Sequence, residues 1–190
     1  MDGYKILAIS GIDGQFDDLK SIEQSLNCTM LRYSYNRSMT FKKNSAYLRK
    51  YILSFNEKII LFGWSIGADL AAFNIDTDNV MSAILINAFF CRSEILRKRN
   101  IYCDEEVCIS DAPKTNKIIS LIYGILDDKI PYSESIRIKG YYESNNLYCY
   151  PVSNAKHNLS SFDTKTIKEI IINNLERSLA YERNVNNCKK

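Results

Sequence analysis

The sequence predicts an α/β domain with a mainly parallel central sheet of about six strands flanked by helices. Short apolar runs alternate along the chain with segments whose apolar residues recur every three or four positions, as in β-α-β units. One apolar run, 58–62, leads directly into a glycine-containing turn and a helical segment. No internal repeat or low-complexity linker is present, so we expect one domain over 1–183 and a polar, disordered tail at 184–190.

The predicted strands and helices follow one another in turn. The expected strands are short β-prone apolar runs at 4–10, 28–35, 58–62, 80–86, 117–123 and 146–152. The expected helices carry apolar stripes within 16–26, 48–55, 68–73 and 167–179. Residues 88–116 have no clear period and mix basic with acidic side chains, so we expect them to leave the sheet as a short lid.

The composition excludes several classes of protein. Hydrophobic residues make up 46% and charged residues 25% of the chain, as in soluble globular proteins. The net charge of +3 is too small for the basic stripe expected of a nucleic-acid-binding protein. We see neither a signal-peptide pattern nor an apolar run near the roughly 18 residues of a spanning helix. We therefore expect a soluble, cytoplasmic protein with no nucleic-acid partner and no membrane span.

The chain has six cysteines, namely Cys28, Cys91, Cys103, Cys108, Cys149 and Cys188. Most lie inside apolar runs, which favours free thiols that pack as small hydrophobic side chains. Cys103 and Cys108 are close enough in sequence to pair or to bind a metal ion. A single histidine and the lack of CxxC spacing argue against zinc, and we expect neither a metal nor another cofactor.

Residues 63–67 read Gly-Trp-Ser-Ile-Gly and match the G-x-S-x-G nucleophile elbow. In such an elbow a tight turn between a strand and a helix lifts the serine hydroxyl above the sheet edge, beside the positive end of the helix. The pentapeptide alone also fits an ordinary connection between a strand and a helix. The strand before it and the helix after it favour Ser65 as a nucleophile.

A serine nucleophile needs a base to remove its proton, and the chain contains one histidine, His157. His157 lies in a polar loop after the predicted strand 146–152. In a parallel sheet this loop lies at the same carboxyl edge as Ser65, where ligands of open α/β sheets bind. The sequence therefore predicts that His157 is the base.

The segment 124–131, GILDDKIP, places two adjacent acids directly after the predicted strand 117–123. A carboxylate at this position can orient the imidazole and support its positive charge. An acidic surface turn is the alternative interpretation of these residues. The order serine, aspartate, histidine along the chain matches one known triad arrangement. It favours a triad whose acid is Asp127 or Asp128.

The motifs at 63–67, 124–131 and 155–159 (AKHNL) resemble the nucleophile, acid and histidine motifs of the α/β-hydrolase superfamily. The resemblance covers essentially the whole chain. In the family pattern the acid lies four residues before a proline, which selects Asp127 over Asp128.

The resemblance also implies an oxyanion hole and a reduced fold. The loop after the first strand, 10–12, corresponds to the family's His-Gly segment and has Ser10 in place of the usual histidine. The implied oxyanion donors are the backbone N–H groups of Ile12 and Ile66. The implied fold is a reduced α/β-hydrolase fold with a short lid at 88–116.

The implied activity is that of a serine esterase or thioesterase, because the chain is most similar to small bacterial-type members of the superfamily. The elbow containing Trp64 also resembles that of pimeloyl-carrier-protein methyl ester esterases, which implies a carrier-linked acyl methyl ester and a role in biotin synthesis. Trp64, Phe89 and Phe90 would line an apolar acyl site, or else pack in the core. The basic cluster of Arg92, Arg97, Lys98 and Arg99 would meet an acidic acyl carrier protein or a phosphopantetheine arm, or else belong to a solvated lid.

Two alternatives stay open at this point. The same triad could act on a thioester, in an acyl-carrier thioesterase or acyltransferase. A binding protein could also keep the fold without the chemistry.

Overall fold

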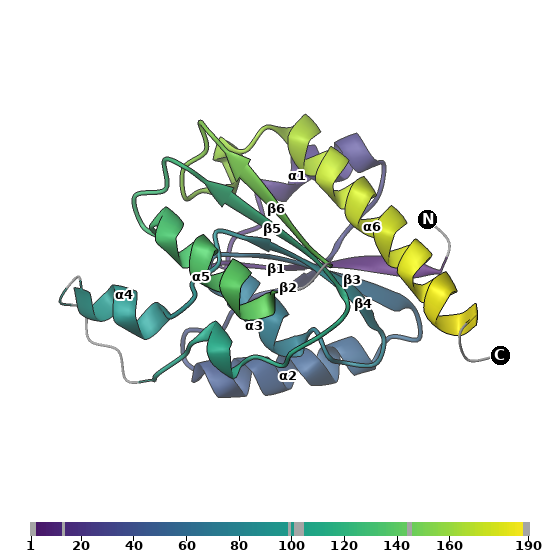
Figure 1. The fold of residues 1–190 in the computed structure, drawn as a ribbon, viewed down its shortest axis with the longest axis horizontal. Coiled ribbons are helices and arrows are strands. Elements are labelled where there is room, and N and C mark those ends of the chain that lie inside the picture. The colour runs from purple at the N-terminus through teal and green to yellow at the C-terminus, as the bar shows by residue number, and fades with distance from the viewer. Residues whose placement is uncertain (1–2, 13, 99, 101–104, 144–145, 188–190) are drawn as a thin grey trace.

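The computed structural model describes residues 3–12, 14–98, 100, 105–143 and 146–187. Within these residues the centre of the molecule is a six-stranded sheet of order β2-β1-β3-β4-β5-β6, in which every neighbouring pair is parallel (Figure 1). The strands are β1 (Tyr4–Ile9), β2 (Leu31–Tyr33), β3 (Lys58–Trp64), β4 (Val80–Ile86), β5 (Ile118–Gly124) and β6 (Leu147–Val152). The predicted class and sheet are confirmed.

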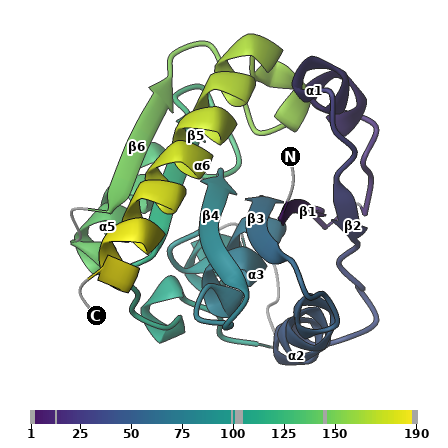
Figure 2. The same cartoon turned by 90° about the vertical axis from the view of Figure 1, so that its right-hand side faces the viewer.

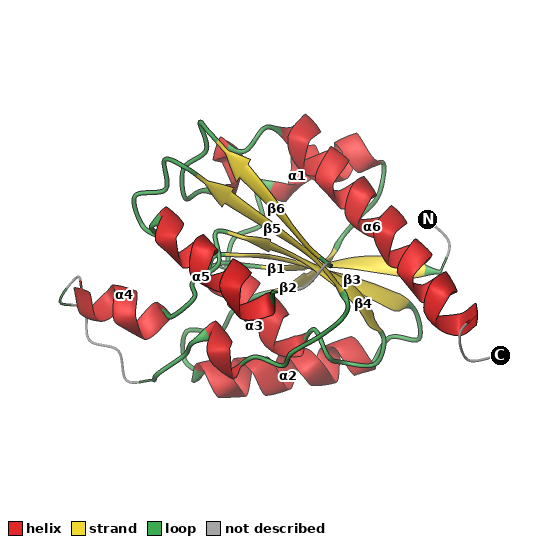
Figure 3. Ribbon diagram, in the orientation of Figure 1, coloured by secondary structure: helices red, strands yellow, loops and turns green. Residues whose placement is uncertain are grey.

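Helices cover both faces of the sheet. They are α1 (Leu19–Leu26), α2 (Phe41–Leu53), α3 (Ile66–Asn74), α4 (Arg92–Lys98), α5 (Tyr132–Tyr142) and α6 (Thr164–Asn187), with 3₁₀ turns at Ile109–Asp111 and Leu159–Ser161. Helices α1 and α6 lie on one face, and α2, α3 and α5 on the other (Figures 1 and 2). Figure 3 shows α4 standing apart from the sheet.

The core lies in two layers, one on each side of the sheet. Leu61 and Leu85 belong to the layer under α2 and α3, whereas Ile60 and Ile84 belong to the layer under α1 and α6. Every residue of β4 and of β5 is buried. Strands buried on both faces read as continuous apolar runs, which is the pattern the sequence shows at these positions. The sheet is therefore enclosed between two apolar layers, with Ser82 and Ser120 as buried polar residues within β4 and β5.

Several elements differ from the expected ranges. Helix α2 begins at Phe41, before the expected stripe at 48–55, and helix α4 forms within the segment 88–116, where no helix was expected. Strand β2 is three residues long, within the predicted 28–35. Helix α5 was not predicted, because Glu134 and Ser135 lie on its buried face and interrupt the apolar period. Helix α6 continues to Asn187, into the stretch 184–190 that was expected to be disordered, and residues 188–190 lie outside the described part of the chain.

The expectation of free thiols is wrong at two positions, because Cys91 and Cys108 form a disulfide. The chain leaves the sheet after β4 and returns, so that these residues also form an antiparallel bridge. Their meeting depends on this return and not on local spacing. Cys28 and Cys149 are free, whereas Cys103 and Cys188 lie outside the described residues. Disulfides persist mainly in oxidising compartments, so the bond does not support the predicted cytoplasmic location.

Among the described helices, none combines the length and the apolar character that a membrane crossing requires.

Candidate active site

Ser65 is the single residue between strand β3 and helix α3, and its backbone has φ 55° and ψ −129°. Positive φ is uncommon for a residue with a Cβ atom and costs about 1–3 kcal/mol. Neighbouring chain segments hold the turn: the Ser65 N–H donates to Ile86 O at 2.9 Å. A Cβ atom on Gly67 would lie 2.3 Å from Ile9 O, so the close approach of β1 requires glycine there. The chain therefore makes the tight, strained turn that the elbow motif predicts.

The His157 ring contacts the carboxylate of Asp127, with Nδ1 2.9 Å from Oδ2. The Asp127 side chain is 1% exposed. Its Oδ1 accepts hydrogen bonds from Lys129 N and Ile130 N, both at 2.8 Å. Burial raises the pKa of Asp127, but the hydrogen bonds from His157 and the two N–H groups outweigh it and hold the pKa below its usual range. Asp127 is thus an ionised acceptor for the ring, whereas Asp128 is exposed.

Asn87, the residue after strand β4, connects the elements that carry the acid and the histidine. Its Nδ2 donates to Lys156 O at 3.0 Å and to His157 O at 3.1 Å, while its Oδ1 accepts from Gly124 N at 2.9 Å. A Cβ atom on Gly124 would lie 2.4 Å from Ala155 O, so the histidine loop packs directly on the end of β5.

The sequence analysis did not identify Asn87. Its signal was an asparagine directly after β4, a strand that is apolar except for Ser82, at the carboxyl edge of the sheet. It has φ 46°, a conformation in which asparagine is enriched.

Ser65 and His157 line one cavity of about 460 Å³ at the carboxyl edge of the sheet. Of the other predicted site residues, this cavity is also lined by Ile12, Trp64, Ile66 and Phe89. Although the structure describes both Ser65 and His157, no hydrogen bond joins their side chains. Such bonds often tighten only in the complex with substrate.

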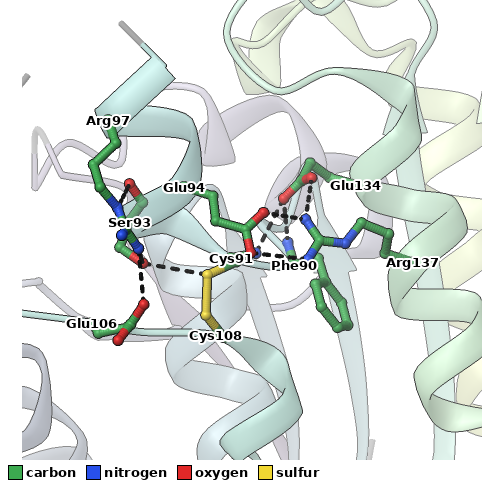
Figure 4. The surroundings of a disulfide bond; sticks show 9 residues. All are labelled: Phe90, Cys91, Ser93, Glu94, Arg97, Glu106, Cys108, Glu134 and Arg137. Carbon is green, nitrogen blue, oxygen red and sulfur yellow. Dashed lines mark hydrogen bonds and ion pairs between the residues drawn. A yellow bond between two sulfur atoms is a disulfide. The ribbon is translucent and has the colours of Figure 1, made fainter. Parts of the chain in front are cut away.

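Two predicted site residues, Phe90 and Arg97, are placed elsewhere. The Phe90 ring packs under the guanidinium of Arg137, with 4.2 Å from Cζ to the ring centroid. Arg97 is exposed and pairs with Glu106 at 2.8 Å, away from Phe90 (Figure 4). Neither Phe90 nor Arg97 lines the cavity, and Arg99 lies outside the described residues.

The two predicted oxyanion donors come from two segments, the loop after β1 and the first turn of α3. Ile66 is the first residue of α3, so its N–H has no acceptor within the helix. The loop that carries Ile12 is anchored by Ser10, whose Oγ accepts from Tyr35 N at 3.1 Å, and by Arg37, whose Nε donates to Ile12 O at 2.7 Å. Ser10 therefore ties the loop to the chain after β2.

Within the described ranges, no group of three or more histidine, cysteine or acidic side chains could hold a metal ion.

No protein-family model matches this chain, and no curated protein does either. Solved structures do match. The esterase domain of a Rhodothermus marinus protein has a TM-score of 0.69 at 15% identity, covering 89% of this chain and 84% of its own. Est1E from Butyrivibrio proteoclasticus has a TM-score of 0.69 at 14% identity, covering 92% and 88%. A monoacylglycerol lipase from Paleococcus ferrophilus has a TM-score of 0.67 at 12% identity, covering 90% and 95%.

A protein of Xanthomonas campestris pv. campestris, described as a putative hydrolase of the alpha/beta superfamily, has a TM-score of 0.67 at 16% identity and covers 92% of this chain and 99% of its own. At these identities the likeness concerns the fold. The chain has a reduced form of the α/β-hydrolase fold, as its motifs predicted.

Proposed function

We propose that this protein hydrolyses a small carboxylic ester, with Ser65 as nucleophile, His157 as base and Asp127 as the acid that orients the ring. One observation carries the proposal. The buried Asp127 carboxylate pairs at 2.9 Å with His157, which lines the same cavity as Ser65.

The hydrogen bond to Asp127 also sets the tautomer of the ring. Because an ionised carboxylate can only accept, Nδ1 carries the proton and Nε2 keeps a free lone pair. Nε2 then removes the proton from Ser65 as Oγ attacks the ester carbonyl carbon, and an oxyanion forms on the carbonyl oxygen.

The N–H groups of Ile66 and Ile12 would donate to that oxyanion. His157 returns the proton to the leaving alcohol as the carbon–oxygen bond breaks, which leaves an acyl group on Ser65. Water, deprotonated by His157, then releases the acid and restores the serine.

The cavity favours a small substrate. Its volume of about 460 Å³ lies in the usual range for small-molecule sites, and Trp64, Phe89, Ile95 and Leu96 give it an apolar wall. The structural neighbours described as esterases and as a monoacylglycerol lipase favour an ester. One structure of Est1E has ferulic acid bound, at a TM-score of 0.67, 16% identity and 90% coverage of each chain.

A carrier-linked substrate has less support. That prediction rested on the Trp64 elbow and on the basic cluster at 92–99. Of this cluster, Arg97 is already paired with Glu106 outside the cavity, and Arg92 lines the cavity. A small ester is therefore the substrate we propose.

Active-site labelling and turnover test the proposal together. A fluorophosphonate probe should label the protein, and p-nitrophenyl butyrate should be hydrolysed. Ser65→Ala should abolish labelling and lower kcat by about 10⁴-fold or more. Ser34→Ala removes a hydroxyl from an exposed residue outside the cavity and should leave both measurements unchanged.

Two results would contradict the proposal. Wild-type turnover in folded Ser65→Ala would exclude this serine as the nucleophile. A folded wild-type protein that neither reacts with the probe nor hydrolyses the ester would instead support a binding protein without this chemistry.

A further inference from the structure

Arg92, at the start of α4, lines the same cavity as Ser65 and His157. Its side chain is half-buried. Its backbone is held in place, because Arg92 N donates to Val107 O at 3.1 Å, next to the disulfide formed by the preceding residue, Cys91. The backbone that carries this cavity-lining arginine is thus held by a cross-linked segment.

Three acids around the start of α4 are already paired with other cations, whereas the buried carboxyl of Asp69 interacts electrostatically with Arg92, with no hydrogen bond between the two side chains. Arg137 donates to Glu94 at 2.7 Å and to Glu134 at 3.1 Å, as Figure 4 shows. Arg97 forms an ion pair with Glu106 at 2.8 Å.

Arg92 itself has no hydrogen bond or ion pair from its side chain to any residue in the described part of the chain. A guanidinium that is partly removed from water without a hydrogen-bonded anion loses hydration that no hydrogen bond from the described residues replaces. A carboxylate of the substrate would restore it through paired N–H···O bonds.

The other charged groups of the cavity come from different loops. Asp17 and Asp18 precede α1, and the Asp18 carboxylate accepts from Ser160 N at 3.2 Å. Lys129, on the acid loop, is exposed. An anionic group of the substrate would therefore be attracted toward Arg92 and Lys129 and repelled from the side of Asp17 and Asp18.

The residues beside Arg92 on the cavity wall are apolar, namely Phe89, Ile95 and Leu96. An apolar wall that ends in a cation complements a methylene chain that ends in an anion. We propose that Arg92 binds a carboxylate at the far end of the acyl chain, so that the preferred substrates are half-esters of dicarboxylic acids. This inference rests on the ester hydrolysis proposed above and defines its substrate class.

A matched pair of substrates isolates the contribution of Arg92. Mono-p-nitrophenyl adipate and p-nitrophenyl hexanoate have acyl chains of equal length, and they differ in the terminal carboxylate. Wild-type protein should have the higher kcat/KM for the adipate half-ester. Arg92→Gln should lower that kcat/KM by about tenfold or more, mainly through KM, and should leave the hexanoate ester within about twofold. Arg92→Lys keeps the positive charge but loses the paired N–H donors of the guanidinium. Its kcat/KM for the adipate half-ester should lie between those of wild type and Arg92→Gln.

Lys98→Gln is the matched control, because it removes one positive charge from the same helix at an exposed position outside the cavity. Lys98→Gln should leave kcat/KM unchanged for both the adipate half-ester and the hexanoate ester. Turnover of the hexanoate ester also reports whether each variant is folded.

The inference is overturned if Arg92→Gln slows both esters equally, or if wild-type protein hydrolyses the hexanoate ester without preferring the half-ester. In either case the proposed ester hydrolysis stands. If wild-type protein hydrolyses neither ester and Ser65 is not labelled, both proposals are overturned.

Discussion

The side-chain amide of Asn87 lies 3.1 Å from the backbone carbonyl oxygen of His157 and donates a hydrogen bond to it. The same residue accepts a hydrogen bond from Gly124, at the end of the strand that precedes Asp127. One buried side chain after β4 thus joins the loop of the proposed base to the strand end of the proposed acid. The distance between the His157 loop and the end of β5 therefore depends on Asn87, a residue that need not contact the substrate.

Asn87→Asp should lower kcat with little change in KM. The substitution replaces an N–H donor with a carboxylate oxygen facing two carbonyl oxygens, and so it should displace the His157 loop. A misplaced base costs rate at the chemical step, and we expect a fall in kcat of about tenfold to 10²-fold. Steady-state kinetics on p-nitrophenyl butyrate would measure it.

Asn79→Asp provides a matched control at the opposite end of β4. Asn79 Nδ2 also donates to two carbonyl oxygens, those of Ile52 at 2.7 Å and Phe55 at 3.1 Å, but outside the cavity. This variant should lose stability and keep kcat. Equal losses of kcat in the two variants would mean that Asn87 has only a structural role.

Asp127→Asn should lower kcat/KM by about 10³–10⁴-fold, because an amide can present its N–H to the ring and favour the wrong tautomer. Asp128→Asn changes the exposed neighbour of Asp127 and should alter kcat/KM by less than about threefold. The comparison is made by kinetics on both variants at one pH. A larger loss in Asp128→Asn would show that Asp128 is the functional acid.

Asp69 should make the folding stability depend on pH. Its carboxyl is buried and accepts a hydrogen bond from Phe89 N at 3.0 Å. Burial raises the pKa of Asp69 well above its usual value, the Phe89 N–H and the positive charge of Arg92 lower it, and Glu134 raises it. As pH rises above about 4, the unfolded chain loses the Asp69 proton while the folded protein keeps it, so the contribution to stability falls.

Asp69→Asn replaces the titrating carboxyl with an amide and so removes its contribution to the pH dependence of stability. The free energy of unfolding of Asp69→Asn, relative to wild type, should therefore increase from pH 4 to pH 8 in urea titrations. Asp78→Asn, at an exposed position, should follow the wild-type curve. Parallel curves for wild type and Asp69→Asn would show that Asp69 does not retain its proton in the folded state.

Reduction of the Cys91–Cys108 disulfide should destabilise the protein. The two cysteines are 17 residues apart, and closing a loop of this size is worth about 3 kcal/mol in the chain-entropy model. The measurement is the free energy of unfolding with and without a thiol-free phosphine reductant. Cys91→Ser/Cys108→Ser should match the reduced protein and should not respond to reductant. A wild-type protein with unchanged stability after complete reduction would contradict the prediction.

The sequence by itself determined the class of the sheet and the order of its strands along the chain. It also placed Ser65, Asp127 and His157 after three of those strands. These features are local, because apolar period, turn residues and a motif of five residues belong to contiguous segments. Parallel strands then bring all their carboxyl ends to one edge.

The tertiary structure alone decided which residues meet at that edge. It paired His157 with Asp127, joined Cys91 to Cys108, and brought Asn87 against the histidine loop. It also placed Arg92 in the lining of the cavity. These contacts join segments about 17 to 70 residues apart in the chain. They depend on how the segments pack, which no local pattern of residue types specifies.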